Sequence, residues 1–162
     1  MTNKLFNNLL LFSLFGIAMW FFGNLYEAIV IGPNMLTDTL VRMGHWQNYF
    51  VVTNPIYFYV PVTQLATVIL IILFFKTDGQ KAVLKRLLKL ATLFQVVSIL
   101  LSIYIITQIN LKLFFGDLTR YADSLSSMAL VWNVLNIIRV VLVGVALVFV
   151  FKAYLETQKN QN

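Results

Sequence analysis

The sequence contains no cysteine and a single histidine, His45. Without cysteine there is no thiol redox chemistry, no disulfide framework and no Cys-based metal site. This excludes membrane oxidoreductases that pass electrons through cysteine pairs. One histidine excludes a haem held by two histidines of the same chain, and His45 with the few acidic residues forms no recognised metal-ligand spacing. We therefore predict no metal and no other cofactor, and we expect His45 to lie in a loop.

Charge is also scarce, because only 11% of the 162 residues are charged and 60% are hydrophobic. Soluble domains carry about 25% charged residues. The mean hydropathy is +0.83. A small domain keeps much of its surface exposed and cannot hide this much apolar surface from water. We predict an integral membrane protein.

The net charge of +6 comes largely from one segment between two apolar runs. Such a cluster suits an anionic membrane surface. The chain lacks the interleaved aromatic and basic residues that single-strand binders use. We predict membrane lipid as a partner and no binding of nucleic acid.

Four apolar runs are each near the roughly 20 residues that cross about 30 Å of hydrocarbon. They cover residues 5–31, 56–75, 87–109 and 128–151. In lipid the backbone must satisfy its own hydrogen bonds, so each run should be a helix. The fold class predicted for residues 1–162 is all-α, a single transmembrane four-helix bundle.

Turn residues mark the expected ends of these helices. The Gly-Pro-Asn run at 32–34 should end the first helix, because proline disfavours helix at the residue before it. Asp78-Gly79 is a turn signal between the second and third runs. Pro55 fits the start of the second helix, and Pro61 either kinks that helix or begins it.

Lysine and arginine set the expected orientation. One side would carry eight of them: Lys4, Lys76, Lys81, Lys85, Arg86, Lys89, Lys152 and Lys159. The other side would carry three: Arg42, Lys112 and Arg120. We therefore expect both termini in the cytoplasm, a multi-pass topology in the bacterial inner (plasma) membrane, and outward-facing loops at 32–55 and 110–127.

Aromatic residues gather near the first outward loop, at Trp46, Tyr49, Phe50, Tyr57, Phe58 and Tyr59. One interpretation is an aromatic belt at the membrane interface. The other is a lid over a pocket.

Two charged residues lie inside the apolar runs, where each costs about 2.5–3.5 kcal/mol on insertion scales. They are Glu27 and Arg139, and they are the obvious candidates to pair with each other. Trp132, Asn136 and Arg139 have the spacing i, i+4, i+7 and therefore share one helix face. Asn24 lies beside the face of the first helix that carries Glu27.

Helix rise places most polar residues of the runs at one depth, in the outer half of the bundle. They are Asn24, Glu27, Asn54, Tyr57, Gln64, Gln108, Asn110, Trp132, Asn133 and Asn136, with Arg139 at the floor. The inner halves are aliphatic except for Gln95 and Ser98. This asymmetry predicts an outward-opening polar pocket. The alternative is that these residues only hold helices together or fix their register.

Three short motifs resemble the anthrone-oxygenase-like family of small four-helix integral membrane proteins, mostly a domain of unknown function. They are TQINLKL at 107–113, WNxxNxxR at 132–139, and GNLYE at 23–27 followed by Pro33. Fungal relatives are described as oxidising a polyketide anthrone without an obvious metal or flavin. Carried over, the resemblance implies a site at Asn110, Trp132, Asn136 and Arg139.

Three functions remain open. In the first, a membrane oxidoreductase acts on a lipophilic or aromatic substrate, with Arg139 stabilising an oxyanion and Glu27 acting as base. Its substrate-binding residues would be Asn24, Gln64, Gln108, Asn110, Trp132 and Asn136. In the second, the protein is not catalytic and binds a lipid-like ligand or serves as an accessory subunit. The third function is a small transporter. It is disfavoured because the inner halves lack the polar groups that a continuous path through the membrane needs.

Overall fold

The computed structural model describes residues 2–79 and 81–159, and the described residues form an all-α bundle. Four helical segments are long and apolar enough to cross a membrane: Asn3–Met35, Pro55–Lys76, Ala82–Leu113 and Thr119–Lys159. Each of the four predicted runs lies inside one of these segments. The elements in chain order are α1 (Asn3–Tyr26), η1 (Glu27–Ile31), α2 (Gly32–Met35), α3 (Thr39–Tyr49), α4 (Pro55–Lys76), α5 (Ala82–Ile105), η2 (Ile106–Asn110), α6 (Leu111–Leu113), η3 (Thr119–Ser124) and α7 (Leu125–Lys159).

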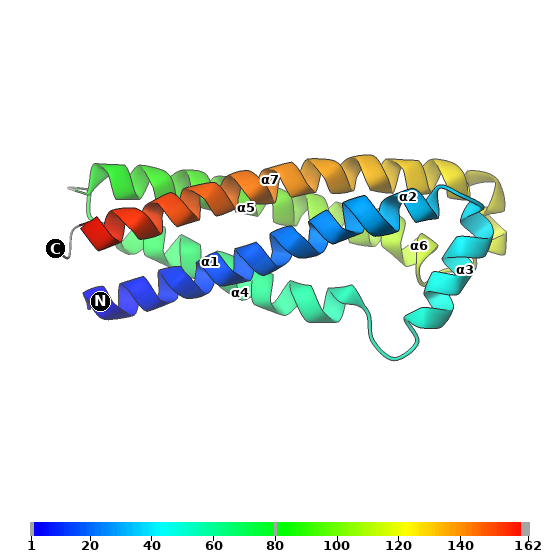
Figure 1. Cartoon of the computed structure of the whole chain (residues 1–162), viewed down its shortest axis with the longest axis horizontal. Coiled ribbons are helices and arrows are strands. Elements are labelled where there is room, and N and C mark those ends of the chain that lie inside the picture. The colour runs from blue at the N-terminus through cyan, green and yellow to red at the C-terminus, as the bar shows by residue number, and fades with distance from the viewer. Residues whose placement is uncertain (1, 80, 160–162) are drawn as a thin grey trace.

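The long helices run side by side and alternate in direction, as Figure 1 shows. The start of α1 and the end of α7 lie at the same end of the bundle, which we call the terminal end. The short helix α3 crosses the opposite end, which we call the distal end. The helix α7 packs on α5 and α1, and α4 packs on α1 and α5. Chain ends at one end of the bundle are what an even number of membrane crossings requires.

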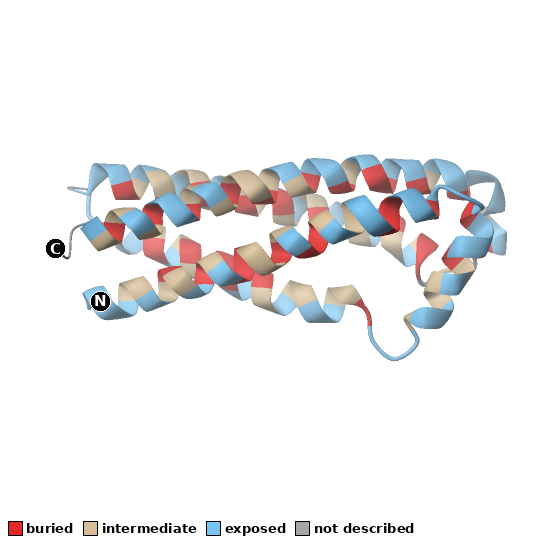
Figure 2. Cartoon of the chain, viewed as in Figure 1, coloured by how far each residue is buried: buried red, intermediate tan, exposed pale blue. Residues whose placement is uncertain are grey.

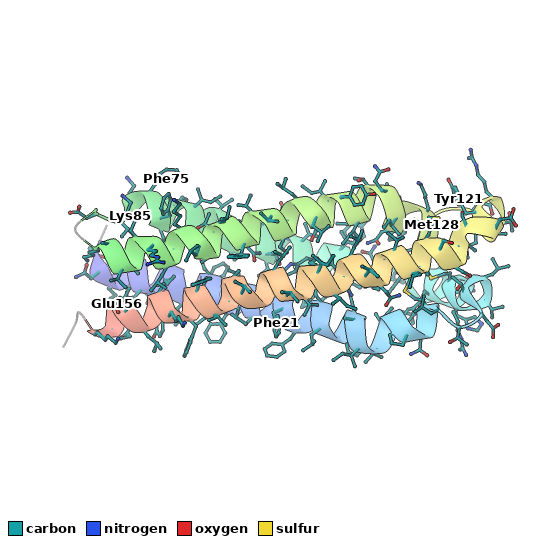
Figure 3. The ribbon with its side chains drawn as sticks, turned by 90° about the horizontal axis from the view of Figure 1, so that it is seen from above. Phe21, Phe75, Lys85, Tyr121, Met128 and Glu156 are labelled. Carbon is teal, nitrogen blue, oxygen red and sulfur yellow. The ribbon has the colours of Figure 1, made fainter. Side chains whose placement is uncertain are left out.

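Large apolar side chains cover the outside of the bundle. Phe15, Phe22 and Phe75 are 67%, 62% and 75% exposed. Buried residues follow the inward sides of the helices (Figure 2), while side chains such as Phe75 project from the outer surface (Figure 3). A surface this apolar is suited to hydrocarbon rather than to water. The architecture is therefore that of a multi-pass membrane protein.

The buried apolar residues form two clusters. The first is toward the terminal end and includes Leu10, Leu70, Leu88 and Val150. The second is toward the distal end and includes Met35, Met43, Ile105, Leu113 and Trp132. Gln95 and Ser98 on α5 are fully buried polar residues, at the positions where the sequence predicted exceptions to an aliphatic interior. Ser13, Thr67 and Thr157 are further buried polar residues of the terminal half, so its interior is not purely aliphatic. Arg139, a buried charged residue, lies on the distal side of them.

The path of the first helix differs from the prediction. The Gly-Pro-Asn run does not end it, because the chain stays helical through η1 and α2 as far as Met35. Pro33 sits in the first turn of α2, where its missing N–H costs no helical hydrogen bond. The expected loop at 32–55 also contains a helix, α3, so His45 is a helical residue and not a loop residue.

The second helix begins where the sequence predicts. Pro55 is its first residue, and Asn54 caps it by accepting a hydrogen bond from the backbone N–H of Ile56. Pro61 lies inside this helix rather than at its start. The cap fixes the position of the chain at the distal end of α4.

Glycine allows α1 and α4 to approach closely at two levels. A Cβ atom on Gly16 would lie 2.9 Å from the Cβ of Ala66, and one on Gly23 would lie 2.6 Å from the ring of Tyr59. The Ser13 hydroxyl adds a hydrogen bond of 3.2 Å to the carbonyl of Ala66. Small residues at such contacts are typical of helix pairs in membranes.

The turn before α7 is held by Asp117, outside the four long segments. Its carboxylate accepts hydrogen bonds from the hydroxyl of Thr119 at 2.6 Å and from the backbone N–H of Thr119 at 3.0 Å. These bonds hold the pKa of Asp117 below its ordinary value. A carboxyl with a lowered pKa contributes stability at neutral pH that is lost as the pH falls through the folded-state value.

Candidate functional site

The predicted pair of intramembrane charges forms. Arg139 on α7 donates from Nη2 to Oε2 of Glu27 at 2.9 Å, which joins α7 to the start of η1. The Arg139 side chain is 4% exposed and that of Glu27 is 15% exposed. The carboxylate therefore faces open space while the guanidinium lies behind it. The second carboxylate oxygen, Oε1, accepts no hydrogen bond from the residues that the structure describes.

Two further side chains hold the guanidinium in place. Nη2 of Arg139 also donates to Oδ1 of Asn136 at 2.7 Å. The guanidinium carbon lies 5.2 Å from the ring centroid of Trp20, within the range of a cation–π interaction. Arg139 is thus fixed from α7 itself and from α1. A buried cation with three such contacts is oriented before any ligand arrives.

Three of the residues just described each carry a buried polar atom with no hydrogen-bond partner among the described residues. These atoms are Nε1 of Trp20, Nδ2 of Asn136 and Nε of Arg139. Other such atoms lie elsewhere in the bundle, for example on Gln95 and Ser98. Most buried polar groups in proteins are paired, so these exceptions call for an explanation.

Beside the pair lies a narrow opening, which we call the inner cleft. Its volume is about 50 Å³, which is room for a few water molecules. Its polar lining is Glu27, Asn54, Asn110 and Arg139. Its aromatic lining is Trp20, Phe50, Tyr59, Phe114, Phe115 and Trp132. A few polar groups among aromatic side chains is the usual composition of a small-molecule site.

A wider opening, the vestibule, adjoins the inner cleft. Its volume is about 540 Å³. The two spaces lie next to each other, because they share the lining residues Glu27, Ile31, Phe50, Pro55 and Tyr59. The α3 helix forms one side of the vestibule, which is also lined by Arg42, His45, Trp46 and Tyr49. Of the six aromatic residues that the sequence grouped here, four line the vestibule: Trp46, Tyr49, Phe50 and Tyr59. Tyr57 and Phe58 line neither opening, and the lid interpretation stays a prediction.

Two wide helical turns border the inner cleft. In η1 the N–H of Gly32 bonds to the carbonyl of Glu27, and in η2 the N–H of Leu111 bonds to the carbonyl of Ile106. Both are i→i+5 bonds, typical of π-helical turns, which occur mostly as single turns and often at functional sites. The turns carry Glu27, Ile31, Ile106 and Asn110 of the cleft lining.

Six of the eight predicted site residues gather around the inner cleft. Glu27, Arg139, Asn110 and Trp132 line it, and Asn24 and Asn136 lie buried behind them. Trp132 and Asn110 also bond to each other, with the indole Nε1 donating to Oδ1 at 2.8 Å. The residues of the predicted site thus come from three long helical segments.

The other two, Gln64 and Gln108, are exposed and line neither opening, so the structure does not bring them to the inner cleft. Their predicted depth says nothing about the helix face on which they lie. Gln108 is two residues from Asn110, which in a helix places the two side chains on nearly opposite sides. Depth along a helix axis cannot distinguish these faces.

The sequence did not identify Asn54 and Tyr59 as site residues. Asn54 was predicted at the right depth, but an Asn before Pro at a helix start is fully explained as a cap. Tyr59 was predicted only as part of an aromatic belt or lid. Within the described ranges, no three His, Cys, Asp or Glu side chains gather into a metal-binding group.

No family model, no curated protein and no solved structure matches this chain. The family resemblance found in the sequence motifs therefore stays a prediction.

Proposed function

We propose that the chain is a membrane oxidoreductase that binds a lipophilic aromatic molecule in the inner cleft and vestibule and needs no bound cofactor. The observation that carries this proposal is the Glu27–Arg139 pair, set at the junction of two aromatic-lined spaces. The vestibule has room for a ring system, and the narrow inner cleft has room for the polar substituents that project from it. The sequence resemblance to the anthrone-oxygenase-like family supports the same assignment.

The pair is arranged to move one proton without changing the net charge of the site. Glu27 has a free carboxylate oxygen that can take the proton of a phenol or enol. The negative charge then passes from Glu27 to the ligand, and Arg139 is placed to stabilise the resulting oxyanion. An uncompensated buried charge, which is strongly destabilising, is never formed.

Dioxygen is the oxidant in this proposal. The deprotonated ligand carbon adds dioxygen to give a peroxide anion, which recovers the proton from Glu27. The hydroperoxide then loses water and becomes a ketone, so that CH₂ and O₂ give C=O and H₂O. Two electron pairs leave the carbon, dioxygen is reduced, and Glu27 returns to its starting state.

The test is oxygen consumption by the protein in liposomes with anthrone as the probe and anthraquinone as the product. We expect Glu27→Gln and Arg139→Lys each to lower kcat/KM by about 100-fold, because a positioned base and an oxyanion partner each contribute about that much. Gln108→Leu is the matched control, since this polar side chain of the same helix level points outward. Unchanged turnover in both site variants, with helical content preserved, would refute the assignment.

The same pair also favours a second candidate, a non-catalytic protein in which Glu27 and Arg139 tie α1 to α7. The two hydrogen bonds from one nitrogen, to Glu27 and Asn136, are what a structural tie would use. In that case Arg139→Lys lowers thermal stability, and anthrone does not bind to the wild-type protein.

The proposed orientation places the terminal end in the cytoplasm and the distal end outside, in the plasma membrane. It rests on the excess of Lys and Arg at the terminal end. The vestibule would then open to the outer leaflet and the external medium.

A further inference from the structure

Two asparagine side chains of the inner cleft have a fixed amide orientation. Oδ1 of Asn110 accepts the indole N–H of Trp132 at 2.8 Å. An indole nitrogen can only donate, so the Asn110 oxygen must point to Trp132. Its Nδ2 group therefore points elsewhere and is left as a donor.

Asn54 is oriented in the same way from another element. Its Oδ1 accepts the backbone N–H of Ile56 at 3.0 Å, and a backbone nitrogen also only donates. The residue is 9% exposed and lines the inner cleft. Its Nδ2 group is likewise left as a donor.

Neither Nδ2 group donates a hydrogen bond within the described residues, and neither is covered. Nδ2 of Asn136, by contrast, is fully covered by neighbouring atoms. Asn54 and Asn110 thus offer two N–H donors to the inner cleft. Phe114 and Ile106 are apolar residues that line the same cleft. Two oriented donors without a protein acceptor are suited to an oxygen acceptor on a ligand.

We infer that Asn54 and Asn110 form a second subsite, which recognises a neutral oxygen acceptor such as a carbonyl on the same ligand. This inference rests on the proposed function, because it assumes that an acidic hydroxyl occupies the Glu27–Arg139 end. The ligand class is then an aromatic molecule with two oxygen groups of opposite hydrogen-bonding character. One group donates to Glu27, and the other accepts from the two amides.

The test measures how tightly the full chain in detergent binds 2-naphthol and a set of acetyl-2-naphthols. The members of the set differ in the ring position of the acetyl group. The best acetyl isomer should bind about 10-fold more tightly than 2-naphthol, the gain from hydrogen bonds to otherwise unpaired donors. Asn54→Asp and Asn110→Asp keep the oxygen that the cap and Trp132 require and remove the N–H donor. Each should abolish the 10-fold preference.

The ratio of the two affinities separates the subsite from the rest of the site. Gln108→Leu, on the outer surface, should leave the ratio unchanged. If 2-naphthol binds but the preference survives both Asp variants, the subsite is refuted and the proposed function stands. If no naphthol binds to the wild-type protein, the proposed function and the subsite are refuted together.

Discussion

Arg139 shows how a buried charge is made tolerable by its neighbours. Asn136 lies on the same helix as Arg139, while Glu27 and Trp20 lie on the first segment. The contacts with Glu27 and Trp20 depend on the two helices meeting at one level. Removing one member of such a pair leaves the other charge buried and uncompensated. Removing both members of the pair leaves no uncompensated charge.

We expect Arg139→Met to destabilise the protein by about 3–5 kcal/mol, because Glu27 is left without its cation. Adding Glu27→Gln should recover a large part of that loss. Thermal unfolding in detergent, followed by circular dichroism, measures both. A double variant as unstable as the sum of the single variants would mean that the two residues are not coupled.

The polar residues show which part of the site could be predicted. Charge alone identifies Glu27 and Arg139, since few roles other than pairing or function are open to charges in an apolar run. Gln64 and Gln108 could not be placed correctly, because an amide carries no comparable penalty and can face outward. Asn54 was concealed by its role as a cap.

At the scale of elements, the helices follow from the hydrophobic runs, while the wide turns do not. A π-helical turn adds one residue without interrupting the apolar run, so residues 27–31 and 106–110 read as ordinary helix in sequence. Proline at position 33 was predicted to end a helix and instead begins a new turn after the first of these. The helix tolerates Pro33 because of the backbone hydrogen-bond pattern of the preceding turn, and this pattern cannot be read from the sequence.

The contact of α1 with α4 gives a prediction at this scale. Gly16→Val should lower stability by about 1–3 kcal/mol, because the added side chain would meet Ala66 with no room to move. Gly44→Ala on α3 is the matched control, since a Cβ there meets no atom within 4 Å. The measurement is the unfolding temperature of the two variants. Equal values for Gly16→Val and Gly44→Ala would contradict the close contact between α1 and α4.

At the scale of the whole molecule, composition predicts the membrane class and the apolar runs predict four crossings. The structure has four helical segments that are long and apolar enough to cross a membrane. The direction of insertion is a separate question, because it depends on charge at the two ends and not on packing. The absence of cysteine makes that question accessible to experiment, since a single introduced thiol is the only one in the protein.

We expect Val52→Cys to react with a membrane-impermeant maleimide on intact cells, because this residue is 93% exposed at the distal end. Gly79→Cys, in the turn at the terminal end, should react only after the membrane is opened. The wild-type chain, which has no thiol, is the blank. The reverse pattern of labelling would invert the proposed topology.

The position of both openings at the distal end has a consequence for regulation. A site that communicates with one compartment takes its acidity and its supply of reactants from that compartment alone. If the distal end faces the medium, as proposed, a ligand of this site would enter from outside the cell or from the outer leaflet. Its supply would then be insulated from the internal state of the cell.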